Sequence, residues 1–341
     1  MDTVTTGLPQ DADTLAAPDI SGYRLGNTGI DYCHRIDSGR PGPTVLVNGL
    51  TKGDEICGLA AVLALLDAPP ALQAGTLLLT LANVAAYERF DAADPARAKF
   101  VDQNFNRIWR DALLDDPAVT DQEVARAREM RPLVTSADVL LDVMSNCHWR
   151  DDQQSWRDPP LLAFIDKPAA RDLAARIPVP AHHIACDRSP GGGMLYEYGA
   201  LGDPTGRPLG LLSESGPHLS PLARDTGIAA ALSLLAALGM VGREVAEAAR
   251  ARCPREPVQL YDRMSVPVAR SDGFRWAGDF RGHERFARGE VIAWDGGEPL
   301  TAPYDDCVLI AVAPEVPKGT GAGHLIRHVA TTPASPEHKT G

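Results

Sequence analysis

GLTKGDEICG, at residues 49–58, directly follows the apolar run TVLVN at residues 44–48. An apolar run, a turn punctuated by glycine and then a segment rich in Ala and Leu, residues 55–66, predict a strand, a loop and a helix. Loops at the carboxyl ends of strands are where open α/β sheets bind their ligands. We therefore expect Lys52 and Glu55 to face a crevice at the edge of an α/β sheet.

The same alternation of strand-like and helical segments continues along the chain. Further apolar runs occupy residues 76–81, 139–143, 161–165, 183–185 and 209–212, and helical composition occupies residues 121–130 and 222–238. This order predicts a mostly parallel sheet flanked by helices.

After Pro254 the sequence pattern changes to short strand-like runs separated by Gly and Pro turns. This pattern predicts a small C-terminal all-β domain. We expect an α/β domain of catalytic type over residues 1–250, with 1–20 flexible. The β domain is expected over residues 255–330, and a polar, disordered tail over 331–341.

The composition restricts the class of protein and of partner. With 341 residues, 44% of them hydrophobic, the chain is long enough to bury a sizeable core. A formal charge of −12 argues against nucleic acid as a partner and favours small molecules. The sequence has neither a signal peptide nor an apolar run of membrane-spanning length, and its six cysteines form no C-x-x-C pair. We expect a cytoplasmic protein with reduced thiols and no membrane partner; homo-oligomerisation stays open.

Four segments carry the functional signal. They are TKGDEICG at 51–58, KFVDQNFNRIW at 99–109, LLDVMSN at 140–146 and LLSESGPH at 211–218. In order and position, these segments resemble the motifs of the succinylglutamate desuccinylase/aspartoacylase family. This family is a branch of the zinc carboxypeptidase fold, and the resemblance covers most of the chain, the C-terminal β region included. It implies a zinc-carboxypeptidase-like α/β domain.

The resemblance also shows what has changed at the zinc ligands. The family's first motif, G-x-H-G-N-E, supplies a histidine and a glutamate, and the matching residues are Lys52 and Glu55. Its D-L-H motif supplies the last histidine, which Met144 matches. A protonated amine and a thioether are poor zinc donors at neutral pH. We therefore expect no metal ligand set of the family type and no cofactor, although zinc is the family's metal.

The substrate-binding and proton-transfer residues of the family are largely retained. The D-L-N-R motif, which binds the substrate carboxylate and polarises the scissile carbonyl, is matched by Asn106 and Arg107, with Asn104 in place of the aspartate. The family also has an arginine upstream of this motif that contacts the substrate, and the matching residue in this sequence is Lys99. The E-x-G-P motif, whose glutamate activates water, is matched by Glu214. These matches make Asn106, Arg107 and Lys99 candidates for binding substrate and Glu214 the candidate base.

Several residues have two interpretations. Lys52 is either an ammonium that stabilises an oxyanion or a desolvated, nucleophilic amine, or else it is a loop lysine paired with Asp54 or Glu55. Cys57, Cys147 and His148 lie near the lost ligands and could form a rearranged metal site, although buried cysteines and a loop histidine are the commoner outcome.

Residues outside the main motifs are less informative. Met144 is expected to fill core space. Tyr196 and Tyr198 are expected on a loop, where they either contact substrate or are simply exposed.

Two functions remain for such a chain. The first is a hydrolase that cleaves an amide (N-acyl) bond of a small compound bearing a carboxylate, with Glu214, Lys52 and Glu55 as the catalytic residues and without the standard zinc site. The alternative is a catalytically silent protein that binds a small-molecule carboxylate.

Overall fold

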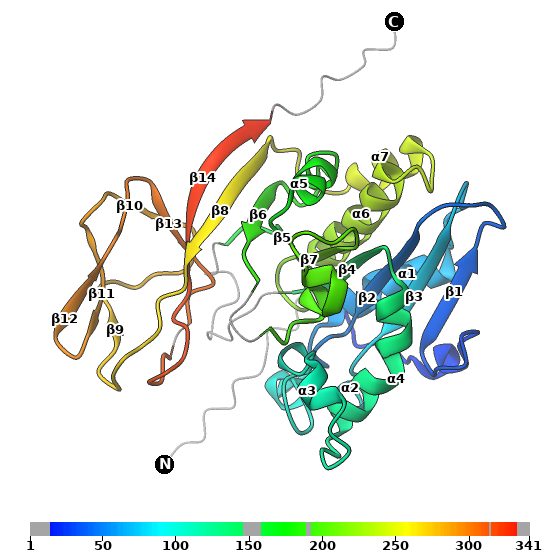
Figure 1. Ribbon diagram of the computed structural model, residues 1–341, viewed down its shortest axis with the longest axis horizontal. Coiled ribbons are helices and arrows are strands. Elements are labelled where there is room, and N and C mark those ends of the chain that lie inside the picture. The colour runs from blue at the N-terminus through cyan, green and yellow to red at the C-terminus, as the bar shows by residue number, and fades with distance from the viewer. Residues whose placement is uncertain (1–13, 146–157, 189–191, 314, 333–341) are drawn as a thin grey trace, which may run out of the picture.

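One large sheet organises the protein (Figure 1). The computed structural model describes residues 14–145, 158–188, 192–313 and 315–332. Within them, eleven strands pair in the order β1-β3-β2-β4-β7-β5-β6-β8-β14-β13-β10. From one edge to the other, their bounds are β1 (Cys33–Asp37), β3 (Thr76–Leu81), β2 (Thr44–Gly49), β4 (Val139–Met144), β7 (Leu209–Glu214), β5 (Leu161–Ile165), β6 (His182–Cys186), β8 (Val258–Ser265), β14 (His324–Thr332), β13 (Cys307–Ile310) and β10 (Glu284–Phe286).

The middle of the sheet is parallel and buried on both faces. Strands β3, β2, β4 and β7 run parallel, whereas β1 and β5 are antiparallel to their neighbours β3 and β7. Every residue of β3 and β4 is buried, and this explains why these strands are mostly apolar and do not alternate between apolar and polar residues. The expected fold class is confirmed, and each of the six apolar runs named from the sequence lies within a strand.

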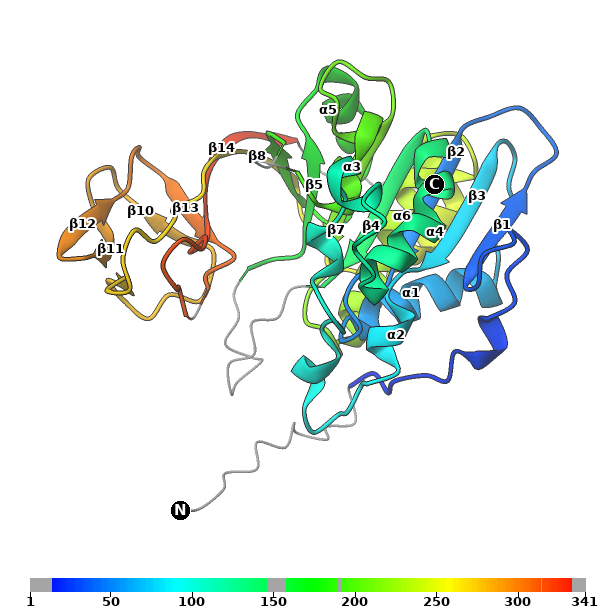
Figure 2. The same ribbon diagram turned by 60° about the horizontal axis from the view of Figure 1, so that its bottom comes forward.

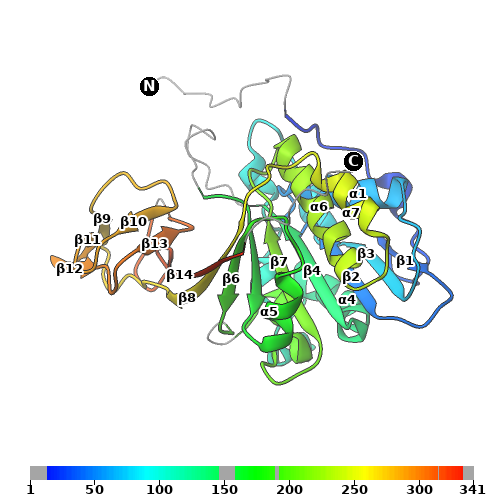
Figure 3. The ribbon, with the colours of Figure 1, turned by 90° about the horizontal axis from the view of Figure 1, so that it is seen from above.

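Helices cover the two faces of the sheet. In Figure 3, α1 (Ile56–Asp67), α6 (Pro221–Ala237) and α7 (Arg243–Arg250) lie together on one face, and α4 (Gln122–Ser136) lies on the other. The shorter helices are α2 (Val84–Tyr87), α3 (Asp111–Leu114) and α5 (Pro168–Ala174), with the 3-10 turns η1 (Ser21–Tyr23), η2 (Pro95–Ala98), η3 (Phe105–Arg107), η5 (Leu195–Glu197) and η6 (Gly199–Gly202). No helix in the described ranges is long and apolar enough to cross a membrane.

The C-terminal β part, which we define as residues 258–332, continues the large sheet instead of standing apart from it. Strand β8 pairs with β6 and β14 pairs with β8, so the sheet runs from the α/β part into this part. A second sheet in the order β12-β11-β9 completes it, with bounds β12 (Glu298–Thr301), β11 (Val291–Asp295) and β9 (Arg275–Trp276). Figure 2 shows this part projecting to one side, connected by β8 and β14.

Two expectations about the chain ends need correction. Leu15 donates its N–H to the Leu219 carbonyl at 2.8 Å, and Ile20 is buried in the core. The end of the segment 1–20, which was expected to be flexible, therefore packs against the α/β part. Thr331 and Thr332, placed in the disordered tail, belong to β14 because they pair with β8. The remainder of both segments lies outside the described residues. The five described cysteines are free and buried, and Cys147 is not described.

Candidate active site

The loop between β2 and α1 is held by close packing and strained backbone. Leu50 adopts a left-handed φ of 63° although it is not glycine, and its side chain is fully buried. Gly53 lies so close to the backbone of Tyr87 and Ala98 that a Cβ would collide with it. These two features restrict the backbone conformation of the loop, and this conformation places Lys52 and Glu55 at the carboxyl end of β2.

A buried polar network supports this loop from below. The Thr51 hydroxyl donates to Asp142 Oδ1 at 2.7 Å, and the Asn48 amide donates to the same oxygen at 2.8 Å. Thr80 in turn donates to Asn48 Oδ1 at 2.8 Å. Burial raises the pKa of Asp142 to about 6, with the bonds from Thr51 and Asn48 opposing the shift. The sequence analysis missed this network, although polar residues at Asn48, Thr80 and Asp142 interrupt otherwise apolar strands.

Lys52 and Glu55 form a buried ion pair. Lys52 Nζ donates to Glu55 Oε1 at 2.9 Å, and the Lys52 backbone N–H donates to Glu55 Oε2 at 3.1 Å. The Glu55 side chain is fully buried and that of Lys52 is 17% exposed. Burial lowers the pKa of Lys52, but the charges of Glu55, Glu214 and Asp54 outweigh burial and the net shift is upward. This direction favours an ammonium over the neutral, nucleophilic amine.

Glu214 ends β7 beside this ion pair. Its register partner on β4 is Met144, and its Oε2 is buried without a hydrogen-bond partner in the part of the chain described. Burial raises the pKa of Glu214, while the charges of Lys52 and Arg107 lower it. A carboxylate with one unengaged oxygen can accept a proton from a bound water.

Met144 and Asn106 satisfy one another inside the protein. The Asn106 amide donates to Met144 Sδ at 3.3 Å, and Asn106 Oδ1 accepts the Leu195 N–H at 2.9 Å. Both side chains are buried, and Met144 packs in the core cluster on the α4 face, as expected for a space-filling methionine. Both polar ends of Asn106 are thus engaged with protein atoms.

The remaining candidate residues, Lys99 and Arg107, add positive charge at the solvent side. Arg107 is exposed and donates from Nη1 to the Asn106 carbonyl at 2.6 Å. Lys99 is exposed as well. Partial desolvation and the charges of Lys52 and Arg107 lower the pKa of Lys99, whereas the charge of Glu55 raises it, and the net shift is downward. The six candidate residues therefore lie in one region of the protein. Their roles in catalysis and substrate binding stay predictions. They are Lys52, Glu55, Lys99, Asn106, Arg107 and Glu214.

Zinc does not fit the two substituted positions. Lys52 is an ammonium bonded to Glu55, and the Met144 sulfur already accepts a hydrogen bond. Among the residues that the structure describes, no group of three or more His, Cys, Asp or Glu side chains is placed to hold a metal ion. Cys147 and His148, the other residues named for a rearranged metal site, lie outside the described residues.

A second buried cluster next to the ion pair was also missed. The Ser145 hydroxyl and His218 Nδ1 are 2.6 Å apart, and His218 Nε2 lies 3.8 Å from Asp54 Oδ2. The His218 carbonyl accepts the Cys57 N–H at 2.8 Å, which ties this cluster to the first turn of α1. The sequence signal was present, because Ser145 and His218 fall inside two of the four motif segments.

The loop tyrosines do not face solvent. Tyr196 is 2% exposed and Tyr198 is 4% exposed, and both belong to the core cluster on the α4 face. Tyr198 packs against Trp109 with ring centroids 5.3 Å apart. Of the two interpretations of these tyrosines, simple exposure is therefore wrong, because the 3-10 turns η5 and η6 fold this segment onto the sheet.

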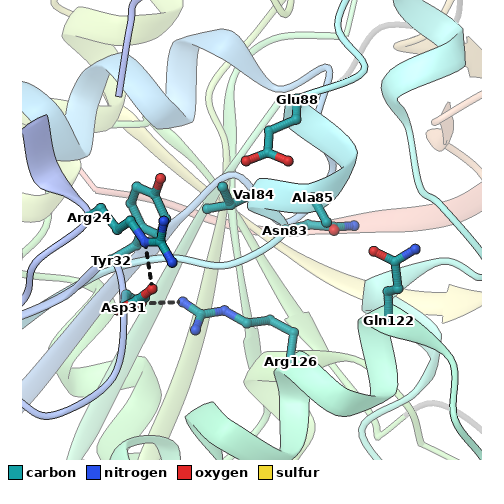
Figure 4. A pocket seen from close by; sticks show the side chains of 9 residues that line it. All are labelled: Arg24, Asp31, Tyr32, Asn83, Val84, Ala85, Glu88, Gln122 and Arg126. Carbon is teal, nitrogen blue, oxygen red and sulfur yellow. Dashed lines mark hydrogen bonds and ion pairs between the residues drawn. The ribbon is translucent and has the colours of Figure 1, made fainter. Parts of the chain in front are cut away.

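A cavity of about 270 Å³ lies outside this cluster (Figure 4). None of the six candidate residues lines it. Arg126 Nη2 donates to the Asp31 and Leu81 carbonyls, and Arg24 Nε donates to Asp31 Oδ2 at 2.9 Å. Since protein atoms already engage both guanidinium groups, this cavity offers little to an anionic ligand.

Comparison with known proteins identifies the fold. No protein-family model matches the chain, and no curated protein matches its sequence. Among solved structures, a succinylglutamate desuccinylase from Vibrio parahaemolyticus matches with a TM-score of 0.61 and 16% identity, over 88% of this chain and 87% of that one. A succinylglutamate desuccinylase/aspartoacylase from Rhodobacter sphaeroides gives a TM-score of 0.59 at 18% identity, over 85% and 87%. The ectoine utilization protein EutE (DoeB) from Ruegeria pomeroyi gives 0.58 at 18%, over 87% and 88%. The chain therefore has the fold of the succinylglutamate desuccinylase/aspartoacylase structures.

Proposed function

We propose that this protein hydrolyses an amide (N-acyl) bond of a small compound bearing a carboxylate, and that it does so without a zinc site of the type that the family motifs imply. The observation that carries the proposal is the buried Lys52–Glu55 ion pair beside Glu214. It places a fixed positive charge next to an unengaged carboxylate oxygen. The positive charge can stabilise an oxyanion and the free oxygen can accept a proton, and amide hydrolysis uses both functions.

The proposed reaction uses these groups in sequence. The Lys52 ammonium, oriented by Glu55, stabilises the negative charge that develops on the carbonyl oxygen. Glu214 takes a proton from water as the water oxygen bonds to the carbonyl carbon. When the C–N bond breaks, the proton held by Glu214 passes to the leaving nitrogen. The products are a carboxylic acid and an amine, so atoms and charge balance.

In this proposal, the substrate carboxylate binds to the exposed side chains of the candidate site. The Arg107 guanidinium is exposed and can form a two-pronged contact with a carboxylate. Lys99 adds a second positive charge nearby. Asn106, whose amide is engaged by Met144 and Leu195, would keep the Arg107 segment in place.

The alternative, a silent protein that binds a carboxylate, has one observation in its favour. The Lys52 ammonium is already neutralised by Glu55 at 2.9 Å, which reduces the charge available to an oxyanion. Such a protein would bind the same ligands through Arg107 without turnover.

The test combines metal analysis with an activity panel. The purified protein is assayed for zinc and for hydrolysis of N-succinyl-L-glutamate, N-acetyl-L-aspartate and related N-acyl amino acids, with a chelator present. We expect turnover without stoichiometric zinc. Activity that requires about one zinc per chain contradicts the metal-free mechanism, and binding without turnover supports the alternative.

Glu214→Gln tests the base directly. A positioned base typically contributes about 10²–10⁴ in rate, so kcat should fall by this factor while ligand affinity changes little. Glu88→Gln, an exposed glutamate at the separate cavity, is the matched control and should retain full activity. Near-normal turnover by Glu214→Gln removes this residue from the mechanism.

A further inference from the structure

A tight turn places two buried acids beside Lys52. The turn runs from Lys52 to Glu55 and is closed by the Glu55 N–H, which donates to the Lys52 carbonyl at 3.1 Å. It contains both Asp54 and Glu55, and the side chains of both are buried. The ammonium of Lys52 donates to Glu55 at 2.9 Å, while the charge of Asp54 also acts on Lys52. One ammonium therefore has two acids of the same turn as possible partners.

His218 lies against the second of these acids. Its Nε2 is 3.8 Å from Asp54 Oδ2, a distance in the range of a charge contact rather than of a hydrogen bond. The two side chains are 6% and 1% exposed, so water and salt screen this contact weakly. Of the two acids, Glu55 thus bonds to Lys52 and Asp54 contacts His218.

Ser145 orients the His218 ring for this contact. The Ser145 hydroxyl, directly after β4, and His218 Nδ1 are 2.6 Å apart. A hydroxyl that donates to Nδ1 leaves the ring proton on Nε2, which is the nitrogen that faces Asp54. The ring then presents a donor rather than a lone pair to the carboxylate.

The backbone of His218 holds the helix that follows the turn. Glu55 is the N-cap residue of α1, but its side chain does not cap the helix and bonds to Lys52 instead. The first N–H groups of a helix have no partner within it. The His218 carbonyl accepts one of them, the Cys57 N–H, at 2.8 Å. His218 therefore supplies a cap that the Glu55 side chain does not, and Glu55 stays available to Lys52.

We propose that His218 is a positioning residue that selects Glu55 over Asp54 as the partner of the Lys52 ammonium. Its ring holds the Asp54 carboxylate, and its carbonyl caps α1 while the Glu55 side chain points back to Lys52. As a statement about catalysis, this inference rests on the proposed function, in which the Lys52 ammonium must lie beside Glu214. The choice of partner itself does not depend on turnover.

A double-mutant cycle on stability tests the choice of partner without an activity assay. Urea unfolding is measured for Glu55→Gln in the wild-type and in the His218→Leu background. In wild type, this substitution leaves Lys52 without its partner. In His218→Leu, Asp54 is released and can pair with Lys52, so the same substitution should raise the unfolding equilibrium constant by a factor at least about tenfold smaller. An equal factor in both backgrounds overturns the inference.

His183→Leu provides the matched control background. His183 is also a buried histidine, but its ring contacts the Pro180 carbonyl. The effect of Glu55→Gln should be the same there as in wild type. A reduction as large as that in His218→Leu would show that the loss of any buried histidine has this effect, and would also overturn the inference.

Two further backgrounds complete the cycle. Adding Asp54→Asn to His218→Leu removes the competing acid, so Glu55→Gln should regain its full effect. Ser145→Ala removes only the hydroxyl that orients the ring and should reduce the effect of Glu55→Gln by a smaller factor. If His218→Leu does not fold, the Ser145→Ala background decides, and an unchanged effect of Glu55→Gln there overturns the inference.

Turnover separates this inference from the proposed function. On an N-acyl amino acid that wild type hydrolyses, His218→Leu should lower kcat by about tenfold to 10²-fold, the scale of a misplaced catalytic group, with KM nearly unchanged. Adding Asp54→Asn should recover most of this loss, which a loss of packing would not allow. If wild type is active and neither kcat nor the stability cycle responds, the inference fails and the proposed function stands. If wild type has no activity, the proposed function fails, and the stability cycle still decides the choice of partner.

Discussion

The loop after β2 and the end of β4 carry Lys52 and Met144 at the two positions where the motifs they resemble have histidine, and these two side chains differ in their surroundings. After β2, Lys52 keeps a positive charge in place and pairs it with a fully buried Glu55. At the end of β4, Met144 joins the core and turns its sulfur to Asn106. One position retains an electrostatic centre, whereas the other has become packing.

The surroundings of the two positions match this difference. The loop that carries Lys52 rests on the buried hydrogen bonds of Asn48, Thr51 and Asp142. Met144 instead shares an apolar cluster with Phe105 and Trp109. Of these two positions, only Lys52 therefore offers a charged group for chemistry beside Glu214, because the thioether of Met144 is already in use.

The largest effect is expected from breaking the ion pair. Glu55→Gln leaves the mostly buried Lys52 ammonium without its charged partner, and removing one member of a buried pair typically costs about 3–5 kcal/mol of unfolding free energy. Urea unfolding measures the loss. The double variant Glu55→Gln with Lys52→Met is the control and should recover much of the stability, since no lone charge remains. A loss below about 1 kcal/mol for the single variant would show that Lys52 reaches solvent instead.

Met144 should respond as a core residue. Met144→Ala removes a buried side chain and should cost about 2–5 kcal/mol, whereas the nearly isosteric Met144→Leu should cost less than about 1.5 kcal/mol. The comparison of unfolding free energies separates packing from the sulfur contact with Asn106. A cost for Leu as large as that for Ala would mean that the sulfur bond, not the volume, matters at this position.

The last prediction concerns Asp158 and the dependence of stability on pH. Burial is the main cause that raises the pKa of Asp158 to about 7, above its ordinary value of 3.8. Its stabilising contribution is therefore full below about pH 3.8 and is lost as the pH rises through 7. Between pH 4 and 7, the unfolding free energy of wild type should fall relative to that of Asp158→Asn. Parallel pH profiles for the two proteins would contradict the shifted pKa.

Regular local patterns made much of the fold predictable. Runs such as residues 76–81 and 161–165 became strands with these same bounds, because a strand buried on both faces consists mainly of apolar residues. The helix expected over residues 121–130 extends to Ser136, with Pro132 inside it, since packing against the sheet overrides a single helix-breaking residue. The chain ends were harder to predict, because β14 and the Leu15 segment are held by partners far along the chain.

For the site, the sequence by itself determined which side chains stand at the strand ends: Lys52, Glu55, Met144 and Glu214 follow from motif position alone. Only the tertiary structure decided their state. The charge on Lys52 depends on Glu55, Glu214 and Asp54, which lie in different segments, and the engagement of Asn106 depends on β4 and η5. Spacing along a chain specifies local geometry, but desolvation and through-space charge depend on what folding brings together.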